Sequence, residues 1–104
     1  MNPTATVRTN VANTPSILTS AGTALADNKA RVMWSIQNLG TNPLFVLRGG
    51  GASTTVFHTI LKGGTGADDG LGAVVSEAAG ACYTGIITVA GTTPRFIVTE
   101  MGFS

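Results

Sequence analysis

The chain has 104 residues, of which 43% are hydrophobic and only 11% are charged, and its formal net charge at pH 7 is +1. This length suits one domain with its own core, and six basic against five acidic residues exclude the basic stripe of a nucleic-acid-binding protein. We therefore expect no direct nucleic-acid partner. No apolar run is long enough for a membrane span, and the first residues lack the charged and apolar regions of an export signal, so we expect no membrane partner.

Residues 1–30 predict an extended N-terminal arm that carries one or two short strands. Thr4–Val11 alternates loosely between polar and apolar side chains, and Ser16–Thr19 is a short apolar segment. Ala24–Ala26 is compatible with one helical turn, which the turn-forming residues that follow would end. The remainder of the chain, residues 31–104, is expected to form the folded domain.

The central stretch predicts three successive strands, at Arg31–Asn38, Leu44–Leu47 and Val56–Lys62, separated by connections rich in Gly, Asn, Pro, Ser and Thr. The first strand alternates, which places Trp34 at the centre of the core. Its core face holds Val32, Trp34 and Ile36, and its other face, expected to be polar or interfacial, holds Arg31, Met33, Ser35 and Gln37. The second strand has no alternation, which indicates burial on both faces.

The second half of the chain begins with Gly63–Gly72, where the density of glycine predicts a long, mobile loop. Ala73–Ser76 is expected to be a short edge strand, and Glu77–Ala81 a helical turn or a turn into the next strand. Gly85–Ala90 and Pro94–Glu100 are predicted strands joined by a compact hairpin connection. About seven or eight strands without a helix of ordinary length predict an all-β fold, a single antiparallel β-sandwich or jelly-roll-like domain.

His58 is the only histidine, so any histidine-based catalysis must use it. Ser53 and Asp68 could be imagined as its partners, but the chain has no GxSxG nucleophile elbow. We therefore expect His58 to be a packed or interfacial residue. Cys82 lies in a mildly apolar setting without a second cysteine, and a buried, reduced thiol is expected.

The glycine-rich loop offers two further kinds of site. A phosphate cradle is not supported, because no GK[ST] sequence follows. A calcium loop is suggested by the opening of the nonapeptide GGxGxDxUx, but Gly70 occupies its apolar position and no second copy stacks on it. The carboxylates available for glycoside hydrolysis are Asp68, Asp69, Glu77 and Glu100. With six aromatic residues, mostly at core positions, we predict no catalytic residue, no cofactor and no metal.

The string IQNLGTNPLFVLRGGGASTTVFHTIL, followed after a Gly/Asp loop by YTGIITVAG and PRFIVTE, resembles small structural proteins of tailed bacteriophages. The shared pattern is a strand ending in IQN, an N-G-x-x-P-x-x-V connection, an F-H-x-x-L strand, a D-G loop and a closing strand that ends in Glu. The resemblance spans residues 31–100. It implies a protein similar to head decoration, or cement, proteins on the capsid lattice, and it carries over no catalytic residue.

The resemblance implies a virion protein on the outer capsid surface, made in the bacterial host cytoplasm, that binds the major capsid protein and itself as a homotrimer or homodimer. The arm at residues 1–30 is its expected bridging element. Five basic side chains are the candidate interface residues: Arg8, Arg48, His58, Lys62 and Arg95. The alternatives are a tail or head-fibre component, a carbohydrate- or receptor-binding β-module with exposed aromatics or a polar cleft, and a small hydrolase with His58 beside an acid.

Overall fold

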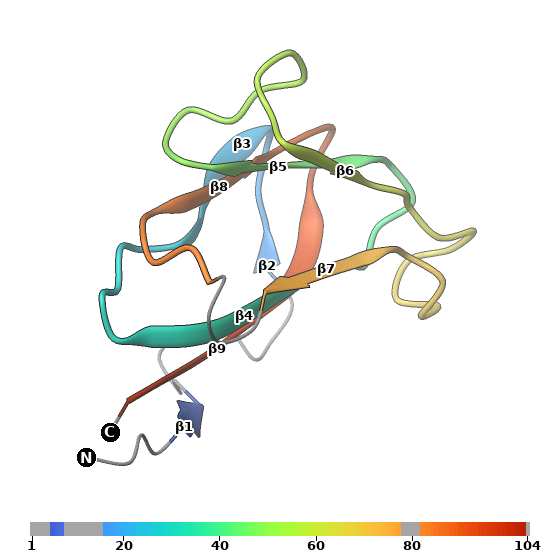
Figure 1. Cartoon of the computed structure of the whole chain (residues 1–104). Helices are drawn as coiled ribbons and strands as arrows, with labels where there is room; N and C mark the ends of the chain where they lie inside the picture. The colour runs from blue at the N-terminus through green and yellow to red at the C-terminus, as the bar shows by residue number, and fades with distance from the viewer. Residues whose placement is uncertain (1–4, 8–15, 78–81, 104) are drawn as a thin grey trace.

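The computed structural model describes residues 5–7, 16–77 and 82–103, and these form nine strands and no helix (Figure 1). The first sheet, called sheet A, has the order β1-β9-β4-β7, with β2 also paired to β9. Its strands are β1 (Ala5–Val7), β2 (Ser16–Ile17), β4 (Arg31–Asn38), β7 (Val74–Glu77) and β9 (Arg95–Phe103). The second, sheet B, has the order β3-β8-β5-β6 and comprises β3 (Ala21–Leu25), β5 (Leu44–Arg48), β6 (Thr59–Leu61) and β8 (Ile87–Ala90). Every strand pairing is antiparallel, which confirms the predicted all-β sandwich.

The core lies between the two sheets, and alternation along each strand supplies it. Trp34 is fully buried at the centre, as predicted, and Phe96 of the neighbouring strand β9 is 2% exposed. The other buried members are Leu25, Ile36, Leu44, Val46, Leu61, Ile87, Val89 and Val98. At about 25 cal/mol for each square ångström of apolar surface removed from water, this cluster is the main stabilising element of the fold.

A second, smaller core covers the outer face of sheet B. The loop between β5 and β6 folds back, so that Ala52 packs against Leu47 and Ala90. In the same layer the rings of Phe45 and Phe57 meet edge to face, with centroids 5.0 Å apart. Strand β5 is therefore covered on both faces, which is what its unbroken apolar sequence predicts.

The end of β4 is organised by a buried asparagine. The side-chain amide nitrogen of Asn38 donates to the carbonyls of Asn42 and Leu61, at 2.8 and 2.9 Å. The side-chain oxygen of Asn38 accepts a hydrogen bond from the backbone amide of Gly40. These bonds satisfy every polar atom of the buried side chain and join the β4–β5 turn to β6. The IQN sequence is thus a structural element of the turn.

Three predicted local elements are corrected, and the part of the predicted arm that the structure describes belongs to the sandwich. Ala24–Ala26 does not form a helical turn, because β3 pairs with β8 and buries Leu25 to 1% exposure. Since β3 is part of sheet B, the predicted arm at 1–30 overlaps the sandwich; residues 1–4 and 8–15 lie outside the described residues.

The predicted strand Val56–Lys62 shortens to Thr59–Leu61, because Ser53 and Val56 form a turn with hydrogen bonds between their backbones. The predicted turn at Glu77–Ala81 is corrected at its first residue, since Glu77 belongs to β7; residues 78–81 are not among those described.

Arg31 was predicted on the outer face of β4, but it is 3% exposed. The register of β4 with β9 shifts between Arg31 and Met33, which is the signature of a β-bulge. The Arg31 Nε donates to Glu100 at 2.7 Å, and the two remaining nitrogens donate to the carbonyls of Ala26, Tyr83 and Gly85. A buried guanidinium is tolerated here because all three of its nitrogens have acceptors.

Candidate interaction face

The outer face of sheet A is a nearly uncharged surface built by strand register. Val74 of β7 lies opposite Gln37 of β4, and Gln37 lies opposite Ile97 of β9, so the three side chains form one row. The next row consists of Ser76, Ser35 and Thr99. Small hydroxyl side chains beside aliphatic ones form a surface that another protein can cover without desolvating a charge. We call these two rows the sheet A face.

Exposed aliphatic side chains lie at both edges of sheet A and in the loop that leads into β7. Val74 is 61% exposed, and Leu71, in the loop that leads into β7, is 65% exposed. Ile17, paired with Arg95 on the far side of β9, is 58% exposed. The side chain of Gln37 donates to the carbonyl of Gly72 at 3.3 Å, which ties the Leu71 loop to the sheet. Exposed aliphatic residues on one side of a sheet are characteristic of interaction surfaces.

The Gly63–Gly72 loop has a defined hydrogen-bond network, which its glycine content did not suggest. The Asp69 carboxylate accepts hydrogen bonds from the amides of Thr65, Gly66 and Leu71 and from the Thr65 hydroxyl. The Leu71 amide, followed by the other three donors, lowers the pKa of Asp69 to about 2. Leu71 is therefore held by the residue that organises the loop.

Asp68 fastens the same loop to sheet A. Its two oxygens accept hydrogen bonds from Arg95 at 2.7 and 2.6 Å, and its amide donates to the carbonyl of Leu39. The hydrogen bond from Arg95 is the main reason why the pKa of Asp68 is below its ordinary value. The positive charge beside the sheet A face is thereby neutralised within the chain.

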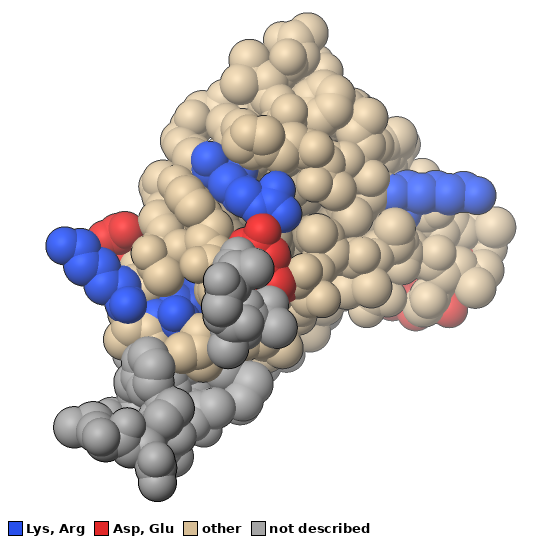
Figure 2. Space-filling model, in the orientation of Figure 1, with Lys and Arg blue, Asp and Glu red and all other residues tan. Residues whose placement is uncertain are grey.

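The predicted interface residues do not form one surface. Arg48 lies between the sheets, where its guanidinium pairs with Glu77 at 2.6 Å and sits 5.6 Å from the ring centre of Trp34. Arg48 and His58 are brought together, since the Arg48 amide donates to Nδ1 of His58. Arg95 pairs with Asp68 beside the sheet A face, Lys62 follows β6 and is exposed, and Arg8 is outside the described residues. Figure 2 shows charged side chains in separate places on a surface that is mostly uncharged.

The four carboxylates considered for catalysis lie in four separate environments. Asp68 and Asp69 are engaged as described above, and Glu100 meets Arg31 inside the protein. Glu77 accepts hydrogen bonds from the Trp34 indole, the Tyr83 amide and Arg48. Burial alone raises the pKa of Glu77, but these donors outweigh it, so its pKa is below the ordinary value. Within the described ranges no three His, Cys, Asp or Glu side chains gather into a metal-binding group.

The imagined triad is not assembled either. The Ser53 hydroxyl accepts hydrogen bonds from the amides of Thr55 and Val56, whereas Asp68 binds Arg95 on the other sheet. Cys82 is a partly buried free thiol rather than a fully buried one, and its burial raises the pKa. A thiol with a raised pKa is a weak nucleophile at neutral pH.

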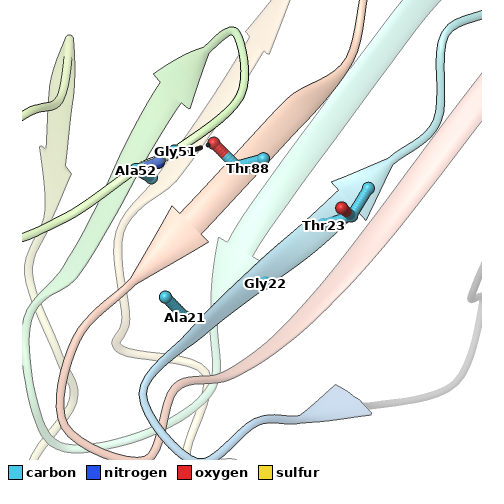
Figure 3. A pocket seen from close by; sticks show the side chains of 6 residues that line it. All are labelled: Ala21, Gly22, Thr23, Gly51, Ala52 and Thr88. Atoms are coloured by element: carbon cyan, nitrogen blue, oxygen red, sulfur yellow. Dashed lines mark hydrogen bonds between the residues drawn. The ribbon is translucent and has the colours of Figure 1, made fainter.

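A shallow groove of about 250 Å³ lies on the outer side of sheet B (Figure 3). Its lining is small and uncharged and consists of Ala21, Gly22, Thr23, Gly51, Ala52 and Thr88. The Thr88 hydroxyl accepts a hydrogen bond from the Ala52 amide and donates to the carbonyl of Gly49, so its polar atom is already used. The groove has no aromatic ring on which a sugar could stack.

Comparisons of the chain with protein-family models, with curated proteins and with solved structures find no match. The described residues contain no helix long and apolar enough to cross a membrane. Sequence reasoning did not single out the exposed aliphatic residues Ile17, Leu71 and Val74. The alternation of Val74 to Glu77 was a signal for Val74, but its meaning depended on knowing which strand lies beside β7.

Proposed function

We propose that this chain is a structural protein of a tailed-bacteriophage particle, a decoration or cement protein that binds the major capsid protein on the outer surface of the head and associates with itself. The observation that carries the proposal is the sheet A face with Leu71 beside it, an uncharged surface with exposed aliphatic side chains on a rigid sheet. The bacteriophage resemblance of residues 31–100 supplies the identity of the partner.

The proposed mechanism is stabilisation of the capsid by the combined contact area of many bound copies. One sheet face supplies a modest interface, and a standard stable protein interface buries about 800 Å² on each partner. On a capsid, a copy that contacts two neighbouring subunits makes its second contact without a further loss of translational freedom, so weak contacts add up. Because the sheet A face contains no ionic groups, we expect binding to depend little on salt.

The experiment compares matched valine-to-lysine variants on capsids that lack the protein. Val74→Lys places a charge on the sheet A face, whereas Val56→Lys places one on the β5–β6 loop, where Val56 is 51% exposed. We expect V74K to lose at least about tenfold in capsid affinity, since an unpaired charge is desolvated on docking, and V56K to bind as the unchanged protein does. Equal binding of both variants would refute the sheet A face as the docking site.

The location of the protein in particles tests the class of function. Cryo-electron microscopy is expected to place it on the head lattice. Density only at the tail or on fibres would replace decoration by the tail or head-fibre alternative, and absence from virions would overturn the proposal. A carbohydrate-binding module is less well supported, because the large, exposed apolar side chains in the described part of the chain are all aliphatic: Ile17, Val56, Ile60, Leu71 and Val74.

A further inference from the structure

Strand β3 is an edge of sheet B with hydrogen-bonding groups directed away from the sheet. β8 is its only neighbour among the described strands. The Gly91 amide donates to the Ser20 carbonyl at 2.8 Å, and in an antiparallel ladder this makes every second residue of β3 face β8. Gly22 therefore faces β8, while the backbone groups of Ala21 and Thr23 face the open edge. Both residues are exposed.

The regular part of this edge, Ala21–Thr23, lacks two common protections against pairing, a charged side chain and a proline. Edge strands are commonly blocked by charged side chains or proline, yet residues 16–26 contain no charged residue and β3 contains no proline. The β5–β6 loop on the other side of the groove, Gly49–His58, has no Lys, Arg, Asp or Glu. β6 has three residues and is followed by exposed Lys62, β7 carries Glu77, and β1 and β2 have only three and two residues. β3, with five residues, is the longest edge strand described.

We infer that β3 pairs with β3 of a second copy, antiparallel and around a two-fold axis at Gly22. This register sets Ala21 opposite Thr23 of the second copy, and the reverse, so the outward backbone groups satisfy one another. It uses only the regular part of the strand, before the register shift between Thr23 and Leu25. The inference rests on the self-association in the proposed function and names the surface responsible.

A second copy suits this edge because the two surfaces match in charge and size. Both are uncharged, so no charge loses water without a partner, and Asp27 and Lys29 lie beyond the paired segment. Ala21 and Thr23 line the groove in Figure 3, together with Gly51 and Ala52, and their side chains are small enough for a second strand to approach. Sheet B then continues from one copy into the other. The sheet A face stays free for docking, because it belongs to the other sheet.

Cysteine pairs test the register directly, in a Cys82→Ala background that removes the native thiol. A hydrogen-bonded antiparallel pair has Cα atoms about 5.5 Å apart, which suits a disulfide. We expect a mixture of Ala21→Cys and Thr23→Cys proteins to give a covalent dimer on mild oxidation. In a dimer of one variant alone, the cysteines of the two copies are not opposite each other and their Cα atoms are about 8 Å apart, so no covalent dimer is expected. Cross-linking of either variant alone, or none in the mixture, would overturn the proposed register.

Thr23→Pro tests the pairing itself. The substitution removes an amide that faces the open edge and that β8 does not use, so the fold tolerates it while the second copy loses a donor. Light scattering over a dilution series is expected to give twice the chain mass of 10.5 kDa for the unchanged protein and the mass of one chain for T23P. If T23P does not fold, Thr23→Lys serves instead, since it brings like charges to the junction. A monomeric unchanged protein, or the same dimer in the folded variant, contradicts the inference.

Capsid binding separates this inference from the proposed function. The folded position-23 variant is expected to keep its docking through the sheet A face in assays at saturating protein, whereas Val74→Lys is expected to lose docking and remain dimeric. Loss of docking in V74K with no dimer in any protein would refute the β3 pairing alone. A normal dimer with no capsid binding in the unchanged protein would refute the decoration function alone.

Discussion

Replacing Arg31 by alanine is expected to be among the most destabilising single changes in this chain. The Arg31 side chain is fully buried, and its partner Glu100 has a side chain that is 4% exposed. Removing the arginine takes this cation away from the carboxylate and removes the guanidinium hydrogen bonds to the carbonyls of Ala26, Tyr83 and Gly85. Breaking one side of a buried ion pair costs about 3 to 5 kcal/mol. A domain of this length has a total unfolding free energy of about 5 to 15 kcal/mol, so much of it is lost.

Thermal and urea unfolding, both followed by fluorescence, measure this effect, because Trp34 is the only tryptophan and is fully buried. R31A is expected to lower Tm by at least about 12 °C, using the smallest shift for each kcal/mol in a domain of this size. Arg31→Lys is expected to be intermediate, since lysine keeps the charge but cannot reach four acceptors with a planar fork.

Arg95→Ala is the matched control. It also removes an arginine from an ion pair, but the side chains of Arg95 and Asp68 are 24% and 47% exposed. Solvent-exposed pairs contribute little to stability, so R95A is expected to unfold close to the unchanged protein. A loss in R31A below about 1 kcal/mol, or one equal to that of R95A, would refute the role assigned to the buried pair.

Three further changes probe the loop and the cluster between the sheets. Gly72→Ala would press a methyl group into the Asn38 carbonyl and is expected to cost about 1 to 3 kcal/mol in urea unfolding, whereas Gly66→Ala, which has open space, should cost little. The pKa of Asp69 is lowered from 3.8 to about 2, so the ionised carboxylate stabilises the folded protein above about pH 4, and this stabilisation is lost as the pH falls through 2. Asp69→Asn should abolish this pH dependence of unfolding and speed amide hydrogen exchange at Leu71. The pKa of Glu77 is likewise lowered, so its stabilisation at neutral pH is lost on acidification, and Glu77→Gln should remove the corresponding change in Trp34 fluorescence.

The strands with strong local signals were predictable. The bounds of β4 match the prediction, because its alternation ends at a Gly- and Pro-containing turn, and β5 differs from the prediction by one residue. The strand β3 was not predictable in the same way. The sequence AGTAL has small residues with no preference for strand, and only its pairing with β8 and the burial of Leu25 make it one.

The proposed interaction face was harder to predict than the fold, because it depends on partners far apart in the sequence. Arg48 and Arg95 looked like free surface charges, but Glu77 and Asp68 neutralise them, 29 and 27 residues away. The row of Val74, Gln37 and Ile97 exists only because β4 lies between β7 and β9. A single sequence shows which side chains alternate, but it does not show which strands are neighbours.

Because of the position of β9, sheet A can be completed only after the last described strand has been synthesised. β9 is the last of the nine described strands, yet it pairs with β1, β2 and β4. During synthesis, sheet A therefore lacks its central strand until residues 95–103 have left the ribosome. Such long-range pairing slows folding, because the chain loses loop entropy before it gains contacts. Until then the sheet A face is incomplete, so a nascent chain cannot engage a binding partner through it before its own core has formed.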